Sequence, residues 1–367
     1  MPVDLLLSRN IPFAVYRLPH SSEIVFVVQN NGLPVEFDLD KLEQQRGFVL
    51  ATFDAYKNGK AFVINPTCIA KTPAEKEKLR KELLQMPESR IHTGNVKEIP
   101  VDKTGYLKQA NHLIDTMKSG VLSKVVLSRI ISKPLPLDFS YADFFNLLHK
   151  SYPLAFVYLF YLPGNGLWAG ATPETLIKKQ NDFYETMALA GTQKTGVSTE
   201  KVVWGEKEKE EQAFVSDFIT TQLKKLDIDT FTIFPEETIR AGRLAHICTR
   251  FRFSRSEMNN KIGRLVKALH PTPAVCGLPR DKAWTLIEKT EQHDRGFYTG
   301  FLGPWNIEGK QHLFVNLRCG RFYQNQLMLY VGGGLTAQSV AEAEWQETED
   351  KSQTLLSLVE NLRNFAP

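Results

Sequence analysis

Residues 155–193, AFVYLFYLPGNGLWAGATPETLIKKQNDFYETMALAGTQ, contain three β-rich runs in succession, with no helical segment between them. The turn-forming stretches PGNG and QND separate the runs. Helical segments occur elsewhere in the chain, but they do not alternate regularly with the strands. We therefore predict an α+β fold, because a doubly wound sheet requires strands and helices to alternate.

Four more short β-rich runs lie toward the N-terminus, within residues 11–70, and the turn signals NNGLP, KNGK and NP divide them. This pattern predicts an antiparallel meander. A charged helix is predicted over residues 72–90, ending near Pro87, with a connector at 91–104. The other predicted helices cover 106–120, 142–153, 205–226, 261–271 and the segment after Ser339. The other predicted strands lie at 124–135, within 230–255, and at 296–307, 312–324 and 326–337.

The composition is that of a globular protein with one large domain or two ordinary ones. The chain has 367 residues, of which 43% are hydrophobic and 23% charged, so a core of useful size is feasible. The net charge is only +4 and charged runs such as EKEKLRK (residues 75–81) mix both signs, which argues against a nucleic-acid-binding surface.

No secretion signal or membrane span is expected. The first residues, MPVDLLLSRNIPF, lack a long apolar region, and no stretch approaches the length of a membrane-spanning helix. Without a secretion signal, scattered cysteines with no C-x-x-C spacing are expected to be reduced thiols in a cytoplasmic protein. The cysteines are Cys68, Cys248, Cys276 and Cys319.

Two predicted helices each begin with a Glu-x-x-Glu pair. The pairs are Glu208 with Glu211, and Glu344 with Glu347. Residues three, four and seven positions apart share a helix face, so each pair falls in line with the apolar stripe of its helix. Carboxylates on a core-facing stripe are costly unless a positive charge meets them, and oxygen ligands favour a hard cation such as Mg²⁺. Alternatively, both pairs form solvated first turns, where acidic residues are favoured.

Two residues are candidates for proton transfer. Lys124 lies early in the apolar strand KVVLSR, so it either points to solvent or is buried, and a buried lysine with a lowered pKa is a usable base. Glu174 follows GATP at a strand junction. There it is either an exposed loop acid or a poorly solvated carboxyl that keeps its proton and acts as a general acid.

Several residues near strand ends could bind an anion. The glycines 332–334 allow backbone N–H groups to approach a ligand, or they mark a bend in a sheet. Arg318, in FVNLRCG, is suited to bidentate binding of a carboxylate or pairs with a structural acid. Tyr298 offers a hydroxyl, although a tyrosine at that position is more often core packing.

Three further polar residues could have structural roles or contact a ligand. Glu291 and Arg295 are interpreted as a structural ion pair. His270, in the proline-rich loop ALHPTPAVCG, either orients a ligand or caps the preceding helix. The eight histidines are dispersed without an H-x-x-x-H motif, so a zinc site is not expected.

Taken in chain order, these segments resemble the chorismate-utilising enzymes of the anthranilate synthase component I type, over residues 105–362. The resemblance implies an α+β fold with large antiparallel sheets and flanking helices. In that fold, residues 105–367 form the chorismate-binding catalytic core and residues 1–104 a variable N-terminal part. The motifs that carry the resemblance are KVVLSR, GATPETLI, LAGT, the Glu-x-x-Glu helix, LHPTPAVCG, DRGFYTGFLG, LRCG, GGGLTAQS and EAEWQETEDK.

The resemblance also implies a set of site residues. Mg²⁺ binds the ring carboxylate of chorismate, with Glu211 and Glu347 as metal ligands and Glu208 and Glu344 in support, directly or through water. Many family members have histidine after the first metal glutamate, where this chain has Gln212. The enolpyruvyl carboxylate is held by Arg318, Tyr298 and the backbone around Gly333 and Gly334; Lys351 lies near the carboxylates, and Thr192 and His270 line the ring pocket.

The residue at position 124 favours one reaction within this family. A lysine there accompanies attack by water, whereas glutamine accompanies the ammonia-using anthranilate synthases. Aminodeoxychorismate synthases carry a second lysine where this chain has Ala190, and no amidotransferase domain or subunit is expected. Isochorismate synthase and salicylate synthase remain, and no residue separates them cleanly. The short length and the LAGT context resemble isochorismate synthases of menaquinone or siderophore pathways, which is the activity we expect.

The expected mechanism uses both proton-transfer candidates. Lys124 takes a proton from a water that attacks C2 of chorismate, and Glu174 protonates the departing C4 hydroxyl. Burial supplies the two pKa shifts this requires, downward for the lysine and upward for the glutamate. The alternatives are a catalytically idle relative that binds chorismate or a protein partner, and a nucleic-acid-binding protein. We expect chorismate as the small-molecule ligand, no membrane partner, and a monomer.

Overall fold

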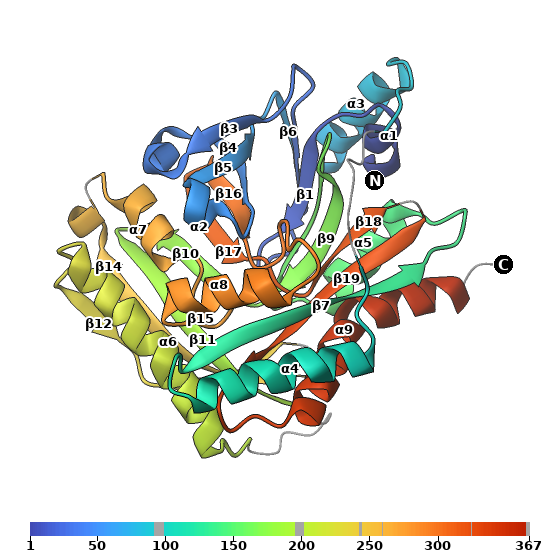
Figure 1. Ribbon diagram of the computed structural model, residues 1–367. Helices are drawn as coiled ribbons and strands as arrows, with labels where there is room; N and C mark the ends of the chain where they lie inside the picture. The colour runs from blue at the N-terminus through green and yellow to red at the C-terminus, as the bar shows by residue number, and fades with distance from the viewer. Residues whose placement is uncertain (92–98, 195–201, 242–243, 259, 324, 365–367) are drawn as a thin grey trace.

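Two large antiparallel sheets pack face to face, with helices on their outer faces (Figure 1). The computed structural model describes residues 1–91, 99–194, 202–241, 244–258, 260–323 and 325–364. Strands and helices are thus mixed without regular alternation, and the predicted α+β class is confirmed.

Each sheet combines strands from both ends of the chain. Sheet A has the order β15 (Gly277–Leu278), β7 (Lys124–Pro134), β19 (Gln326–Leu335), β18 (Cys319–Tyr323), β9 (Gly166–Thr172), β8 (Phe156–Leu162), β1 (Phe13–Arg17), β2 (Val25–Val28) and β6 (Cys68–Ala70). Sheet B has the order β12 (Phe231–Ile233), β14 (Leu244–Ser254), β11 (Phe183–Lys194), β10 (Thr175–Gln180), β17 (Lys310–Val315), β16 (Phe301–Ile307), β4 (Gly47–Ala51), β5 (Lys60–Ile64) and β3 (Val35–Asp38), and β13 (Glu237–Ala241) pairs with β14.

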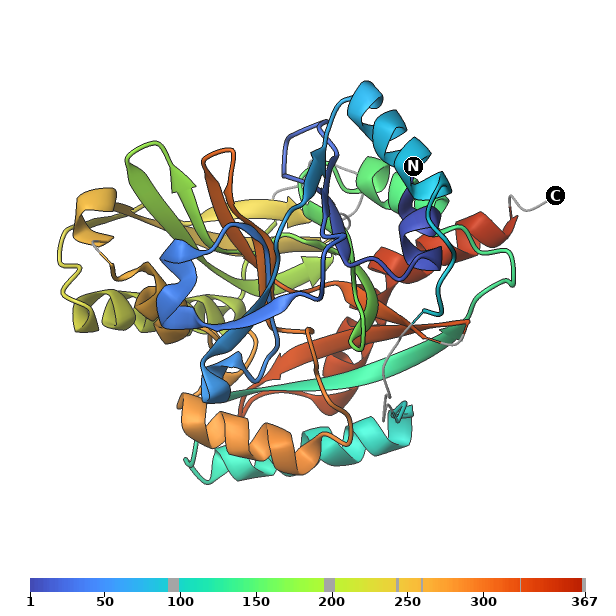
Figure 2. The same cartoon turned by 90° about the horizontal axis from the view of Figure 1, so that it is seen from above.

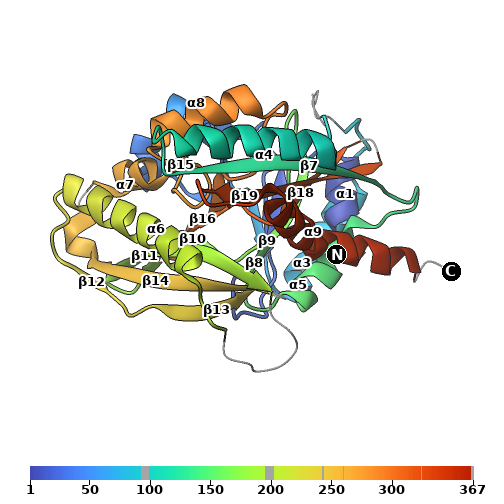
Figure 3. The same ribbon diagram turned by 60° about the horizontal axis from the view of Figure 1, so that its bottom comes forward.

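The helices cover the outer faces of the sheets (Figure 3). The outer face of sheet A packs against α1 (Val3–Ser8), α3 (Pro73–Leu84), α5 (Tyr141–Ser151) and α9 (Ala341–Asn364). The outer face of sheet B packs against α6 (Glu206–Lys225) and α7 (Ile262–Leu269). Helices α4 (Lys103–Lys118) and α8 (Arg280–Thr290) pack beside β7, and α2 (Ala55–Asn58) is a single turn.

Side-chain alternation along the strands supplies both the outer cores and the layer between the sheets. In β1, Phe13 and Val15 pack toward the helices, whereas Ala14 and Tyr16 pack between the sheets. Successive side chains of a strand point to opposite faces, so a strand covered on both faces is buried throughout. The layer between the sheets is largely aromatic.

The N-terminal strands do not form the predicted meander. Strands β1 and β2 join sheet A, while β4 and β5 join sheet B, so the first seventy residues are divided between the sheets (Figure 2). The strands themselves were predicted correctly, but their partners β8 and β16 come from distant parts of the sequence. Turn signals indicate where a strand ends, and they carry no information about which sheet the next strand enters.

Two segments predicted as single strands are each broken where the chain passes from one sheet to the other. The 167–180 segment leaves sheet A after Thr172 and enters sheet B at Thr175. The 312–324 segment leaves sheet B after Val315 and enters sheet A at Cys319. Pro173 has no N–H to donate to a strand ladder, which explains the first break.

The described chain also bears on the expectations about membrane spans, cysteines and helices. None of its helices combines the length and the apolar composition that crossing a membrane requires. All four cysteines are free, in agreement with the predicted thiols. The helix α8 was not predicted from the sequence.

We expect Leu50→Ala to lower the free energy of unfolding by roughly 2–5 kcal/mol, because it leaves a cavity between the sheets. Leu50 is fully buried in that layer and belongs to an N-terminal strand. Urea denaturation followed by circular dichroism measures the change. Leu137→Ala is the matched control, since Leu137 is 93% exposed, and it should change the free energy by less than about 0.5 kcal/mol. Equal values for the two variants would contradict the packing described for β4.

Candidate active site

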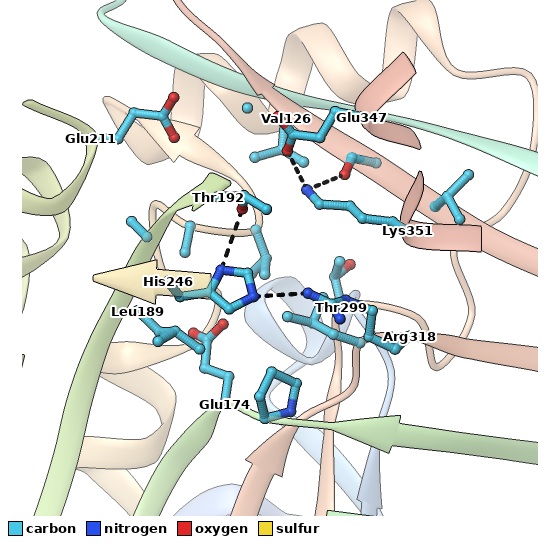
Figure 4. Close-up of a pocket in the computed structure, with 18 of the residues that line it drawn as sticks. Val126, Glu174, Leu189, Thr192, Glu211, His246, Thr299, Arg318, Glu347 and Lys351 are labelled. Atoms are coloured by element: carbon cyan, nitrogen blue, oxygen red, sulfur yellow. Dashed lines mark hydrogen bonds and ion pairs between the residues drawn. The ribbon is translucent and has the colours of Figure 1, made fainter. Parts of the chain in front are cut away.

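A cavity opens where the two sheets meet, and most of the predicted site residues line it. Figure 4 shows Glu211 and Glu347 at one end of the cavity and Glu174 at the other, with His246 and Arg318 between them. The predicted residues among those that line the cavity are Lys124, Glu174, Thr192, Glu211, Tyr298, Arg318, Gly334, Glu347 and Lys351.

Glu174 and Arg318 lie at the two passages between the sheets, which are hydrogen bonded to each other. The Thr172 hydroxyl donates to the carbonyl of Val315 at 2.6 Å, and the Val315 amide donates to the carbonyl of Glu174 at 3.0 Å. Arg318 was predicted within a strand, but it follows β17 in a left-handed backbone conformation with φ of 51°. This geometry directs both side chains into the cavity instead of along a strand.

The Glu174 carboxyl keeps its proton near neutral pH. Its residue is 2% exposed, and Oε1 has no hydrogen-bond partner among the described residues. Burial raises the pKa of Glu174 to about 8, although the positive charge of Lys124 acts in the opposite direction. The alternative of an exposed loop acid is wrong, and the side chain has the protonation state of a general acid.

Lys124 points into the cavity from the start of β7. Its side chain is 2% exposed, and Nζ lies 3.1 Å from Glu211 Oε2, so the alternative of a solvent-facing lysine is wrong. Gly334 on the neighbouring strand β19 gives it room, because a Cβ there would lie 2.8 Å from Lys124 Cε. The glycines 332–334 thus lie within the strand predicted at 326–337, and a close approach explains the glycine at 334.

Three of the four predicted metal glutamates gather at the same end of the cavity as Lys124. Lys207 Nζ lies 2.6 Å from Glu344 Oε1 and 3.9 Å from Glu211 Oε1, while Lys351 Nζ lies 2.6 Å from Glu347 Oε1. Burial and the negative charge of Glu347 raise the pKa of Glu344. Burial alone would raise the pKa of Glu347 too, but the adjacent ammonium of Lys351 holds it below its usual value.

Glu208 is the exception among the four. Its carboxylate accepts a hydrogen bond from the Gly205 amide at 2.9 Å, in a capping arrangement at the start of α6. Acidic residues at that helix position satisfy free backbone N–H groups. Glu208 does not line the cavity. Its position therefore argues against direct contact with a metal ion bound there.

The glutamate cluster suits a hard cation in its donor chemistry, although no cluster of three or more candidate ligands in the described residues is arranged around a metal position as it stands. Instead, each of the three carboxylates forms an ion pair with a lysine. One oxygen, Glu344 Oε2, is buried without a partner among the described groups. An unpaired buried carboxylate oxygen beside two other carboxylates fits Mg²⁺ better than a softer metal.

His246 belongs to the site and was missed in the sequence. Its Nδ1 lies 3.0 Å from the Gly191 carbonyl and 3.3 Å from the Thr192 hydroxyl, and Arg318 donates to its Nε2 at 2.9 Å. Burial and the charge of Arg318 lower the pKa of His246 to about 3, so the ring is neutral. No spacing in LAHICTR distinguishes it from a packed strand histidine, which explains why the sequence gave no signal.

His270 and Gly333 lie outside the cavity lining, contrary to the roles implied for them. The His270 ring donates to the carbonyl of Phe53 at 3.1 Å and packs edge-on against Phe301. Burial lowers the pKa of His270 to about 4. Gly333 faces Glu344, because a Cβ there would lie 3.1 Å from Glu344 Oε2. The cavity wall near His270 consists instead of Ala274 and Val275.

The remaining wall is held by a buried ion pair and by aromatic stacking. Arg295 donates to both oxygens of Glu291, at 2.6 and 2.8 Å, which confirms the predicted structural pair. The same guanidinium donates to the carbonyls of Val126 and Val275, both of which line the cavity. Tyr298 is buried beside them, and burial raises its pKa.

Comparison with known proteins places this geometry in a family. Over 259 residues, 69% of this chain, the sequence is 26% identical to the vibriobactin-specific isochorismate synthase of Vibrio cholerae serotype O1, and the match spans 66% of that relative. That is just under two thirds of the relative's length.

Solved structures share the fold. The menaquinone-specific isochorismate synthase MenF of Escherichia coli aligns with a TM-score of 0.78 at 22% identity, covering 98% of this chain and 91% of that one. Anthranilate synthase component I of Streptococcus pneumoniae TIGR4 aligns with a TM-score of 0.68 at 18% identity, covering 95% of this chain and 91% of that one. A family model described as chorismate binding enzyme matches residues 43–360, and the chain therefore belongs to the chorismate binding enzyme family.

Proposed function

We propose that the protein is an isochorismate synthase, which converts chorismate into isochorismate. The observation that carries the proposal is a buried lysine and a protonated buried carboxyl in one cavity. Lys124 pairs with Glu211, and Figure 4 shows Glu211 at one end of the cavity and Glu174 at the other. The names of relatives of this chain, among them siderophore- and menaquinone-specific isochorismate synthases, support the same reaction.

In this proposal Lys124 is the general base. It takes a proton from a water molecule that attacks C2 of chorismate, on the side of the ring that faces the glutamates. Lys124 first has to release a proton to solvent and its ion pair with Glu211 has to open, because an ammonium group has no lone pair with which to accept a proton from water. A second ligand for Glu211 would therefore favour the reactive form of the lysine.

Glu174 is the general acid. It protonates the C4 hydroxyl as this group leaves, and the ring double bonds shift to give isochorismate. Its pKa of about 8 keeps the proton available at neutral pH without holding it too tightly to transfer. The acid and the base act on opposite sides of the ring, and both line the cavity.

The two carboxylates of chorismate match Arg318 in one part of the cavity and a cation held by the glutamates in the other. Arg318, with Tyr298 beside it, is placed to hold the enolpyruvyl carboxylate. Mg²⁺ held by Glu211, Glu344 and Glu347 would neutralise the ring carboxylate at the other end. Lys351, which also donates to the Gly332 carbonyl at 2.9 Å, pairs with Glu347 at 2.6 Å and offsets its charge.

Incubation of the purified protein with chorismate, with and without Mg²⁺, tests the proposal directly. We expect isochorismate in reversible balance with chorismate, only when Mg²⁺ is present, and chromatography of the products measures it. Salicylate with pyruvate would instead identify a salicylate synthase with the same site. Absence of any product would identify a relative that only binds its ligand.

Glu174→Gln should lower kcat by roughly 10²–10⁴-fold, because an amide cannot donate a proton to the leaving hydroxyl. Steady-state rates of isochorismate formation measure the loss. Glu206→Gln is a suitable control, since Glu206 is exposed and outside the cavity, and its rate should equal that of the wild type. Turnover by Glu174→Gln at the wild-type rate would remove Glu174 from the acid role.

The same carboxyl should make stability depend on pH. Its pKa is about 8 in the folded protein and close to 4.5 in an unfolded chain, so the native state binds this proton more tightly. The wild type therefore loses stability as the pH rises from about 4.5 through 8, by up to roughly 5 kcal/mol, and Glu174→Gln does not. Urea denaturation of both proteins between pH 5 and 9 measures the difference. A constant difference across that range would show that Glu174 is ionised when folded.

A further inference from the structure

Lys207 occupies the position among the glutamates where a cation is needed. It extends from α6, and its ammonium lies 2.6 Å from Glu344 Oε1 on α9 and 3.9 Å from Glu211 Oε1 on its own helix. The lysine thus joins the two helices that supply the glutamates. No feature of the sequence singled it out, and the proposed reaction gives it no role.

The cluster is balanced in charge without a metal ion. Each carboxylate has a lysine partner: Glu211 pairs with Lys124, Glu344 with Lys207 and Glu347 with Lys351, at 3.1, 2.6 and 2.6 Å. Glu344 is 1% exposed, and its second oxygen is buried without a partner in the described chain. A divalent cation entering this cluster would meet carboxylates that are already paired with ammonium groups, so a lysine has to release its carboxylate.

Of the three lysines, Lys207 is the one free to move. The side chain of Lys124 is 2% exposed and pairs with Glu211 at 3.1 Å. The side chain of Lys351 is 18% exposed and is also held by the carbonyl of Gly332. Lys207 is 34% exposed, and within the described residues its one hydrogen bond is to Glu344, so its ammonium can turn into solvent.

We propose that Lys207 is an internal counter-cation that Mg²⁺ displaces. In the metal-free protein its ammonium holds Glu344 and Glu211 together across α6 and α9. When Mg²⁺ binds, the ammonium moves to solvent and Glu344 presents its oxygens to the metal. This inference rests on the proposed function only for the identity of the metal, and it makes Lys207 a residue that sets metal affinity.

The test measures Mg²⁺ binding by isothermal titration calorimetry in the absence of chorismate. Lys207→Gln removes the competing charge and should bind Mg²⁺ roughly 10- to 100-fold more tightly than the wild type. Lys207→Arg keeps the charge and should not bind more tightly. Lys209→Gln is the matched control, because Lys209 lies on the same helix in an exposed pair with Glu206, and its affinity should stay within about twofold.

Thermal unfolding supplies a second readout that does not depend on activity. Without metal, Lys207→Gln should unfold at a lower temperature than the wild type, because its buried glutamates lack a counter-charge, and Mg²⁺ should raise its Tm by more than it raises that of the wild type. Equal or weaker Mg²⁺ binding by Lys207→Gln would overturn the inference and leave the proposed reaction intact. Absence of Mg²⁺ binding by every variant would overturn both the inference and the metal site of the proposed function.

Discussion

The two passages between the sheets are the constraint on which the site depends. They are hydrogen bonded to each other through Thr172, Glu174 and Val315, so neither can shift without disturbing strands of both sheets. Close packing of the aromatic layer beneath them opposes any such shift. Glu174 and Arg318 therefore hold fixed positions at the cavity wall, which an acid and an anion-binding group need if they are to act on one substrate.

The two ends of the cavity differ in the charge of the side chains that line them. One end collects glutamates and lysines whose charges offset each other, and the other has a neutral carboxyl at Glu174 and a neutral imidazole at His246. Of the described residues that line the cavity, Arg318 is a positive charge beside these neutral groups, and it donates to the His246 ring. A ligand with two separated carboxylates matches this pattern better than one with a single charge.

The sequence predicted which residues line the cavity better than it predicted the path of the chain. Lys124, Glu211 and Glu347 could be found because a charged residue on an apolar stripe is unusual, and the structure brings them to one cavity. The sequence predicted a strand junction at Glu174 but not the change of sheet there, since residues buried on both sheets have the same composition. Two other residues, His246 and Lys207, gain their importance only from neighbours distant in sequence.

The division of the N-terminal strands between the sheets has a consequence for synthesis on the ribosome. Strand β4 pairs with residues 301–305 of β16, so its partner emerges only when most of the chain has been made. Strand β5 can pair with one edge of β4 early, but until β16 is made the other edge of residues 47–51 has no strand beside it and is open to association with other nascent chains. The first strands are therefore exposed to misassociation during translation, long before the cavity forms.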